Sequence, residues 1–382
     1  MGTMQTELIE SVERILPFVS GWDQLAAEQG RPYCSPSWML SWWRHLAPGG
    51  ARLAVVVVRD GDDLVAIAPF FADRRKGTTR YRLLASRGGA PTLPLARTGM
   101  EQAASMEITG CLGAATFSPD LVMLDGVPAS SGWTSLLREG WGVNPARRSY
   151  DVSKPLTGLT LRGRSFEEWM DGKSSHFRKK LRRLRRRLEE QGAVFRMTSR
   201  ADELGPDLRA FMRLHEKRWE SRGGSAVVRP ATEAMLTQVA HELLPQGRFR
   251  LWSIERQGEI LASEIYVSAG GTTAYWLGGF DDAWAEYSPG LLTMLSSLEH
   301  AWQAGDDRVE FGAGDQDYKN RFAEDREQLD WSLIIPPGRG SVGARMHIVD
   351  AWVQIARGRI GARLPDDVKA RLRRLSARVA RR

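Results

Sequence analysis

The segment FRKKLRRLRRRLEEQG, residues 177–192, constrains the fold more than any other part of the chain. Eight of its first eleven residues are Lys or Arg. Its apolar residues recur at intervals of four, three and four, at Phe177, Leu181, Leu184 and Leu188. This spacing predicts a helix with one apolar stripe and otherwise cationic faces, which Gly192 is well placed to end. Such a helix packs on a core through its leucines and offers positive charge to cofactor phosphates, RNA, a lipid surface or only water.

Positive charge is concentrated in two segments. The net charge of the 382 residues is +8, but residues 172–191 alone carry +7 and residues 345–382 carry +8. The rest of the chain therefore carries −7, the difference between +8 and the +15 of the two segments. Two basic segments on a mildly acidic body favour local contacts with anions over a protein that is cationic everywhere.

Cysteine usage and hydropathy exclude several classes of protein. The two cysteines, Cys34 and Cys111, form no CxxC motif or Cys/His cluster, so no metal site is expected. The sequence shows no signal-peptide pattern, and its longest apolar runs, such as residues 53–58, are too short to span a bilayer. We therefore expect a cytoplasmic protein with reduced thiols.

The first half of the chain contains a clear strand hairpin. Residues 51–59 and 64–71 are apolar runs of strand length, and the turn residues Asp60-Gly61-Asp62 separate them. Residues 87–130 contain many Gly, Pro and Ala, and we expect them to be irregular.

The second half alternates helices with strands. A capping box at Ser165 opens a helix ahead of the basic one. Three strands at 249–256, 260–269 and 272–278 form an antiparallel meander. The chain is therefore expected to be a mixed α+β protein. Its predicted parts are a first domain at 1–155, a second at 156–338 that includes the basic helix 174–191, and a basic helical tail at 339–382.

A candidate anion site lies where a helix begins after the meander. The loop residues Ser288 and Pro289 precede this helix, and Pro is well suited to its first position. The N–H groups of Gly290, Leu291 and Leu292 would then point out of the helix end, where the helix dipole favours a phosphate or a carboxylate. The alternative is a capped helix without a ligand.

Four residues near this loop are candidates for chemistry. Glu264 lies in an apolar strand, so partial burial would raise its pKa and suit it to act as a base, unless it is paired or at a strand edge. Asp281 could bind an amine or cap its loop. The glycines of the segment 312–314 allow a sharp bend that places Tyr318 and Lys319 at a helix start. Lys319 could neutralise an anionic substrate, or be an ordinary exposed lysine.

Several short motifs, taken in order, carry a resemblance to a known family. They are Ser35-Pro36 with Trp38 and Trp42, the run LVAIAPF at 64–70, the basic helix from Phe177, GEILA at 258–262, Phe280-Asp281, Ser288-Pro289-Gly290, and Phe311-Gly312-x-Gly314 followed by Tyr318-Lys319. Over roughly residues 30–335, the chain resembles the FemAB-like branch of the GNAT acyltransferases. More narrowly, it resembles the CelD-like acetyltransferases of cellulose biosynthesis.

The resemblance implies two GNAT-like lobes, each a mostly antiparallel twisted sheet flanked by helices. It also implies an acyl-CoA, such as acetyl-CoA, in a V-shaped gap between splayed strands, with its pyrophosphate on the N–H groups of residues 288–292. Tyr318 would take the place of the tyrosine that protonates the leaving thiolate. The usual Q/R-x-x-G-x-G/A loop is absent, so aminoacyl-tRNA, which FemAB-like relatives use, is the alternative donor.

Three hypotheses follow. The first is direct transfer of an acyl group from acyl-CoA to an amine or hydroxyl of a small molecule or glycan. The second is an aminoacyl-tRNA-dependent peptide-bond former, and the third is a non-catalytic partner of RNA or membrane. The basic helix would bind the anion through Arg178, Lys179, Arg182, Arg183 and Arg186. The tail could extend this surface or contact anionic lipid.

Overall fold

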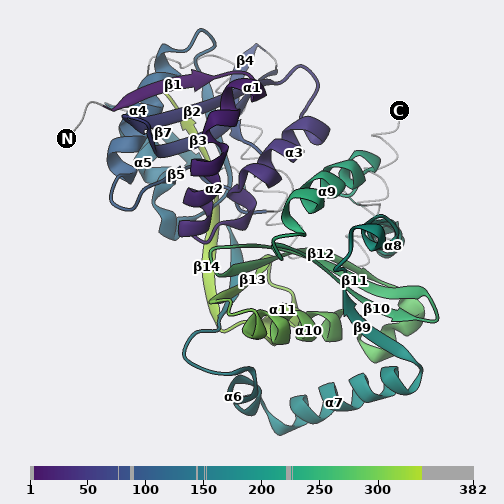
Figure 1. The fold of residues 1–382 in the computed structure, drawn as a ribbon. Coiled ribbons are helices and arrows are strands. Elements are labelled where there is room, and N and C mark those ends of the chain that lie inside the picture. Colours follow the sequence, from purple (N-terminus) through teal and green to yellow (C-terminus); the bar gives the residue numbers. More distant parts are fainter. Residues whose placement is uncertain are drawn as a thin grey trace, which may run out of the picture. The chain divides into compact units, whose positions relative to one another are not determined.

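The computed structural model describes residues 4–75, 77–86, 90–142, 145–149, 151, 153–220, 225 and 227–337 (Figure 1). These residues form two compact units. The first contains the chain up to Leu156 together with residues 313–315 and the part from Arg326 onward, and the second contains Thr157–Gly312 and Gln316–Asp325. The tail predicted at 339–382 lies outside the described residues.

The first unit is built on a sheet with the strand order β1-β2-β3-β4-β6-β14. Its strands are β1 (Gln5–Ile9), β2 (Arg52–Asp60), β3 (Asp63–Arg75), β4 (Thr78–Leu83), β5 (Leu95–Ala96), β6 (Leu121–Pro128), β7 (Ala146–Ser149) and β14 (Asp325–Ile335). Its α-helices are α1 (Val12–Ile15), α2 (Val19–Glu28), α3 (Pro36–Leu46), α4 (Glu101–Ala114) and α5 (Trp133–Gly140). Short 3-10 turns are η1 (Leu16–Phe18), η2 (Pro32–Cys34) and η4 (Ala129–Ser131). Pairing of β2 with β3 across Asp60 and Asp63 confirms the predicted hairpin.

Two features of the first unit differ from expectation. The region 87–130 is not irregular, because it contains α4 and β6. The face of α4 that packs inward is made partly of small residues such as Ala104 and Ser105, so the helix lacks a strong apolar stripe. Residues 326–335 of β14, which the sequence placed in the second domain, belong to the first unit, and residues 329–335 pair with β6 or β7 there.

One buried ion pair closes the parallel part of the first sheet. Strands β4 and β6 are parallel and are paired over only three residues, up to Arg82 and Met123. The Arg82 guanidinium donates to both oxygens of Asp125, at 2.8 and 2.5 Å, and the Ser86 hydroxyl also donates to Asp125 at 3.1 Å. The Arg82 and Asp125 side chains are each only 6% exposed.

The second unit has the strand order β8-β13-β12-β11-β10-β9. The strands are β8 (Lys154–Thr160), β9 (Ala193–Met197), β10 (Phe249–Arg256), β11 (Glu259–Ala269), β12 (Thr272–Phe280) and β13 (Arg308–Ala313). The helices are α6 (Phe166–Asp171), α7 (Ser175–Glu190), α8 (Ala201–Glu220), α9 (Pro230–Leu243), the 3-10 helix η5 (Asp282–Tyr287), α10 (Pro289–Gln303) and α11 (Asp317–Asn320). Strands β10, β11 and β12 form the predicted antiparallel meander. In this unit α8 and α9 cover one face of the sheet and α10 and α11 the other (Figure 1).

The basic segment folds as the predicted amphipathic helix α7. Leu181, Leu184 and Leu188 are buried in the same apolar cluster as α10, and each stabilises the fold by about 1.5–3 kcal/mol through its burial. The Ser174 hydroxyl caps the first turn by accepting from the Phe177 N–H at 3.3 Å. The leucines therefore fix the helix on the core and leave its cationic side outside.

Helix α8 lies directly on β12 because Gly279 has no side chain. A Cβ added at Gly279 would lie 2.5 Å from the His215 backbone nitrogen and 2.7 Å from the Leu214 carbonyl carbon. Backbone atoms cannot give way as a flexible side chain can, so any larger residue pushes the helix off the strand. The sheet carries the site described below, and this contact sets the position of α8 over it.

We predict that Gly279→Ala destabilises the protein by about 1–3 kcal/mol, because the added methyl overpacks this contact. Urea unfolding followed by circular dichroism measures the change. Gly110→Ala in α4 is the matched control, since its Cβ would meet nothing within 4 Å and alanine favours a helix by about 0.5–1 kcal/mol. Equal stability of Gly279→Ala and wild type would contradict the packing described.

Candidate active site

The site lies where strands β12 and β13 stop pairing. The two strands are parallel partners only from Thr272 and Arg308 to Ala274 and Glu310, although β12 continues to Phe280 and β13 to Ala313. On the other side of β12, the pairing with β11 shifts by one residue at Tyr266. A gap in strand pairing and an adjacent bulge leave room for side chains between the sheet and the helices that follow.

Glu264 is the buried carboxyl of this region. It lies on β11, is 4% exposed, and accepts a 2.6 Å hydrogen bond from the Tyr266 hydroxyl. Burial raises the pKa of Glu264 to about 8, against the opposing effects of that hydrogen bond and of the charges of Arg218 and Lys319. The carboxyl is therefore mostly protonated at neutral pH and ionises in the range where a base is useful.

Two more tyrosines surround this carboxyl. The Tyr275 ring packs edge-on against the Tyr266 ring, with centroids 5.4 Å apart. The Tyr275 side chain is hydrogen-bonded to that of Tyr318. Burial raises the pKa of both phenols above the ordinary value of 10, and the charge on Glu264 adds to the effect for Tyr318. Both hydroxyls keep their protons near neutral pH and can donate hydrogen bonds.

Lys319 is buried, unlike the exposed lysine usually found at a helix start. It is 3% exposed, and its Nζ lies 5.7 Å from the centre of the Tyr275 ring. Burial lowers the pKa of Lys319 to about 8, while the charge of Glu264 opposes the shift. The structure thus brings Glu264, Tyr318 and Lys319 into one cluster.

The predicted anion corner adjoins the same cluster. Ser288 has a left-handed backbone, with φ 51°, and its carbonyl accepts from the N–H groups of Leu291 and Leu292 at 3.0 and 3.2 Å. Of the three N–H groups expected to point outward, the one on Gly290 is the one with no recorded partner in the described part of the chain. A Cβ at Gly290 would lie 3.4 Å from Cδ1 of Phe280 and 3.6 Å from Oε1 of Glu264, so the helix start and the carboxyl are adjacent.

Asp281 is engaged as a cap. Its Oδ1 accepts from the Ala283 N–H at 3.0 Å at the start of η5, and the Lys217 Nζ lies 3.0 Å from the same oxygen. The hydrogen bond from Ala283 lowers the pKa of Asp281, with a further contribution from Lys217. Of the two roles considered for Asp281, the geometry favours capping.

The sequence did not single out three residues of this cluster, namely Arg218, Tyr266 and Tyr275. Tyr266 follows Glu264 by two positions on one strand, and this period of two could have identified it, because such residues face the same side. Nothing local marks Arg218 or Tyr275, which reach the site from α8 and β12.

Helix α7 carries cations with and without partners. Arg178 pairs with Asp171 at 3.0 Å and Arg186 with Glu190 at 3.4 Å. Within the described ranges, no hydrogen bond or ion pair is recorded for the row Lys179, Arg182 and Arg183, which lies opposite the buried leucines.

The same helix also contacts the loop that leads into α10. The Arg187 guanidinium lies 3.0 Å from an oxygen of Glu286 and 4.7 Å above the Tyr287 ring, and both partners belong to η5. The cationic helix is therefore fixed beside the segment that precedes the anion corner.

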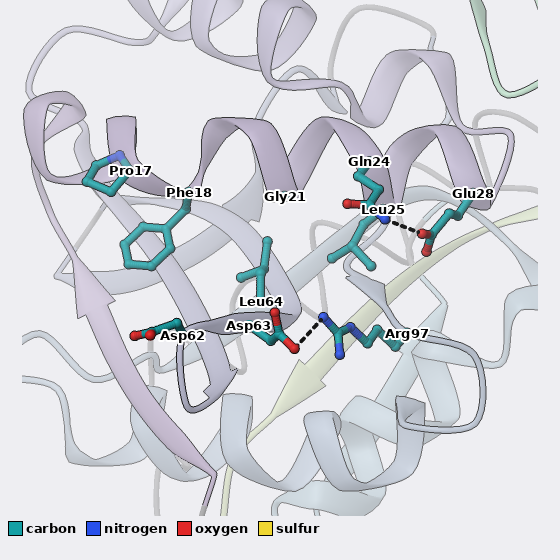
Figure 2. Close-up of a pocket in the computed structure, with 10 residues that line it drawn as sticks. All are labelled: Pro17, Phe18, Gly21, Gln24, Leu25, Glu28, Asp62, Asp63, Leu64 and Arg97. Carbon is teal, nitrogen blue, oxygen red and sulfur yellow. Dashed lines mark hydrogen bonds and ion pairs between the residues drawn. The ribbon is translucent and has the colours of Figure 1, made fainter.

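The first unit contains a separate small cavity, of about 170 Å³ (Figure 2). It lies between α2 and the start of β3, and an Arg97–Asp63 ion pair of 3.5 Å crosses one side. None of the predicted site residues lines it. Among the residues in the described ranges, no group of three His, Cys, Asp or Glu side chains is placed to hold a metal, and no helix is long and apolar enough to cross a membrane.

Comparison with known proteins identifies the fold. Residues 175–320 match the family model described as an acetyltransferase (GNAT) domain. A FemX crystal structure aligns over 90% of this chain and 100% of its own, with a TM-score of 0.57 and 10% identity. The C-terminal domain (DUF2156) of an Agrobacterium fabrum protein assigned as a lysylphosphatidylglycerol synthetase aligns over 89% and 97%, with a TM-score of 0.55 and 12% identity. A search of curated proteins found no match. The predicted mixed α+β fold is confirmed.

We predict that the Glu264 contribution to stability falls as the pH rises from 5 to 8. Between the ordinary pKa of 4.5 and the folded pKa of about 8, the folded chain holds its proton on Glu264 more tightly than the unfolded chain does. Each pKa unit corresponds to about 1.4 kcal/mol, so Glu264→Gln should become several kcal/mol more stable relative to wild type over this range. Lys319, with its lowered pKa, acts in the opposite sense and only above pH 8.

Urea unfolding at pH 5, 6.5 and 8 measures this difference. Glu259→Gln, at an exposed position at the start of the same strand, is the control and should follow the wild-type curve. Parallel pH dependences of wild type and Glu264→Gln would show that the carboxyl ionises normally in the folded protein.

Proposed function

We propose that this chain, whose residues 175–320 match the family model of an acetyltransferase (GNAT) domain, transfers an acyl group directly from acyl-CoA to an amine or hydroxyl of a small molecule or glycan. The observation that carries the proposal is the position of Glu264. A buried carboxyl with a pKa of about 8 lies beside a helix start suited to anions and beside the Tyr275–Tyr318 pair.

The reaction needs two proton transfers. Ionised Glu264 accepts the proton of the acceptor amine or hydroxyl as its nitrogen or oxygen attacks the acyl carbonyl. The resulting tetrahedral intermediate collapses by breaking the carbon–sulfur bond, and the leaving thiolate takes the proton of the Tyr318 hydroxyl. Tyr318 then regains a proton from solvent and Glu264 gives its own up, so the enzyme returns to its starting state without a covalent intermediate.

The start of α10 fits the acyl carbonyl oxygen, on which negative charge develops, because Gly290 adjoins Glu264, where the thioester must lie. This helix has 15 residues, so its dipole is fully developed, and the Gly290 N–H is available at its first turn. The absence of a side chain at Gly290 lets the carbonyl oxygen approach the backbone N–H, whereas the phosphates of acyl-CoA lie a whole pantetheine arm away from this corner. Lys319, whose charge is felt at Glu264, stabilises the negative charge that develops on the carbonyl oxygen in the transition state.

One observation favours a second donor, aminoacyl-tRNA. The row Lys179, Arg182 and Arg183, for which no partner is recorded among the described residues, provides more positive charge than the few phosphates of CoA need. Helix α7 also contacts η5, which precedes the start of α10. A cytoplasmic location, with Cys34 and Cys111 as free thiols, suits either donor. Contact of the tail with anionic lipid also stays a proposal.

Removing the base is predicted to lower turnover. Glu264→Gln should reduce kcat by about 10²- to 10⁴-fold, because glutamine cannot accept the proton. Tyr318→Phe should also reduce kcat with little change in KM for the donor. Release of CoA thiol, measured with a chromogenic disulfide over a panel of amines, gives both constants. If both variants keep the wild-type kcat, these residues do not carry the chemistry.

If the donor is aminoacyl-tRNA, charge reversal on α7 should weaken tRNA binding and reduce its dependence on salt. The variant is Lys179→Glu/Arg182→Glu/Arg183→Glu, and each lost phosphate contact lowers the slope of log K against log salt by about 0.7–0.9. The control makes the same change of charge at exposed Arg74, Arg75 and Arg213. Filter binding at several salt concentrations measures the slopes. Equal slopes for both triple variants would exclude α7 as a tRNA site.

A further inference from the structure

Arg218 is a cation of the site, and among the described residues no acidic partner is recorded for it. It lies near the end of α8, is half-buried, and its guanidinium carbon is 4.5 Å from the centre of the Phe280 ring. In the part of the chain that the structure describes, no hydrogen bond or ion pair is recorded for its side chain. The adjacent Lys217, by contrast, pairs with Asp281 at 3.0 Å.

Phe280 connects Arg218 to the reacting centre. Phe280 is the last residue of β12, and the edge of its ring lies against Gly290. Oε1 of Glu264 lies next to the same glycine. The positive charge of Arg218 lowers the pKa values of Glu264, Tyr275 and Tyr318. The guanidinium therefore lies within electrostatic reach of every group that the proposed reaction uses.

The charge balance of this cluster calls for an anion. While Glu264 holds its proton, Arg218 and Lys319 leave the cluster positively charged. A half-buried guanidinium has lost part of its hydration. The anions that best offset this loss are a carboxylate and a phosphate, because each can accept two parallel hydrogen bonds from the planar guanidinium. The contact with the Phe280 ring, 4.5 Å from the guanidinium carbon to the ring centre, helps to hold the guanidinium in place.

This anion cannot be the charged part of an acyl-CoA. The thioester of acyl-CoA is separated from the nearest phosphate by the whole pantetheine arm. When the thioester lies at Glu264, the phosphates are at the far end of that arm, so a cation within reach of Glu264 faces the acceptor.

We propose that the acceptor carries a carboxylate or phosphate close to its reacting amine or hydroxyl, and that Arg218 binds this acid group. The proposal rests on the proposed function and narrows it to acidic acceptors, such as amino acids or phosphorylated amino sugars. Arg218 thereby selects the substrate and orients its nucleophile towards Glu264.

Matched acceptors test the proposal. The pairs are glucosamine 6-phosphate with glucosamine, and an amino acid with its amide, each assayed with acetyl-CoA. We expect wild type to prefer the acidic member. Arg218→Gln should lower kcat/KM for that member by about 10- to 150-fold, and clearly less for the neutral member, which loses only the effect of the Arg218 charge on Glu264 and Tyr318. Arg218→Lys should recover part of the loss, because it keeps the charge without the planar guanidinium. Arg213→Gln, at an exposed position on the same helix, should behave as wild type.

Three results would overturn the proposal: no preference for acidic acceptors in wild type, an equal loss for both members in Arg218→Gln, or weaker CoA binding with unchanged acceptor selectivity. Calorimetric titration with the same acceptors supplies a readout that needs no turnover. Absence of transfer to every acceptor by wild type refutes the proposed function, whereas Arg218-dependent binding of the acidic compounds would still support an acid site at this position.

Discussion

Burial of the Glu264 carboxyl is the constraint on which the chemistry of the second unit depends. The same loss of water that raises its pKa to about 8 also makes the Tyr266 hydrogen bond necessary. A protonated carboxyl can be packed under α10 without a buried negative charge, so the fold tolerates it. When the carboxyl ionises near neutral pH, the carboxylate is poorly hydrated and therefore readily accepts a proton.

The residues of helix α7 that pack on the core and those available to bind a partner lie on opposite faces of the helix. Leu181, Leu184 and Leu188 supply the packing, so its cations are not needed for the core. Repulsion between like charges at neighbouring turns costs a few tenths of a kcal/mol per pair, which the leucine contacts readily offset. The cationic row is therefore available to a partner without any change in the fold.

The sequence predicted those elements whose pattern is local. The leucine spacing gave α7, and the alternation of turns and apolar runs gave the meander β10–β12. It failed for α4, because small residues on its inner face leave no apolar stripe. It identified Glu264 from its apolar neighbours, but Tyr275 and Arg218 reach the site through the β11–β12 bulge and the packing of α8 on Gly279, which depend on contacts distant in sequence.

The two units share a parallel strand pair of three residues, β4–β6 in one and β12–β13 in the other, and each second strand contains a left-handed glycine, Gly126 or Gly312. In the first unit the Arg82–Asp125 ion pair occupies this region. The same local strand geometry therefore holds an ion pair in one unit and adjoins the titratable cluster around Glu264 in the other. Loss of either Arg82 or Asp125 would leave the other charge buried without its partner, so these two residues are expected to be exchanged only together.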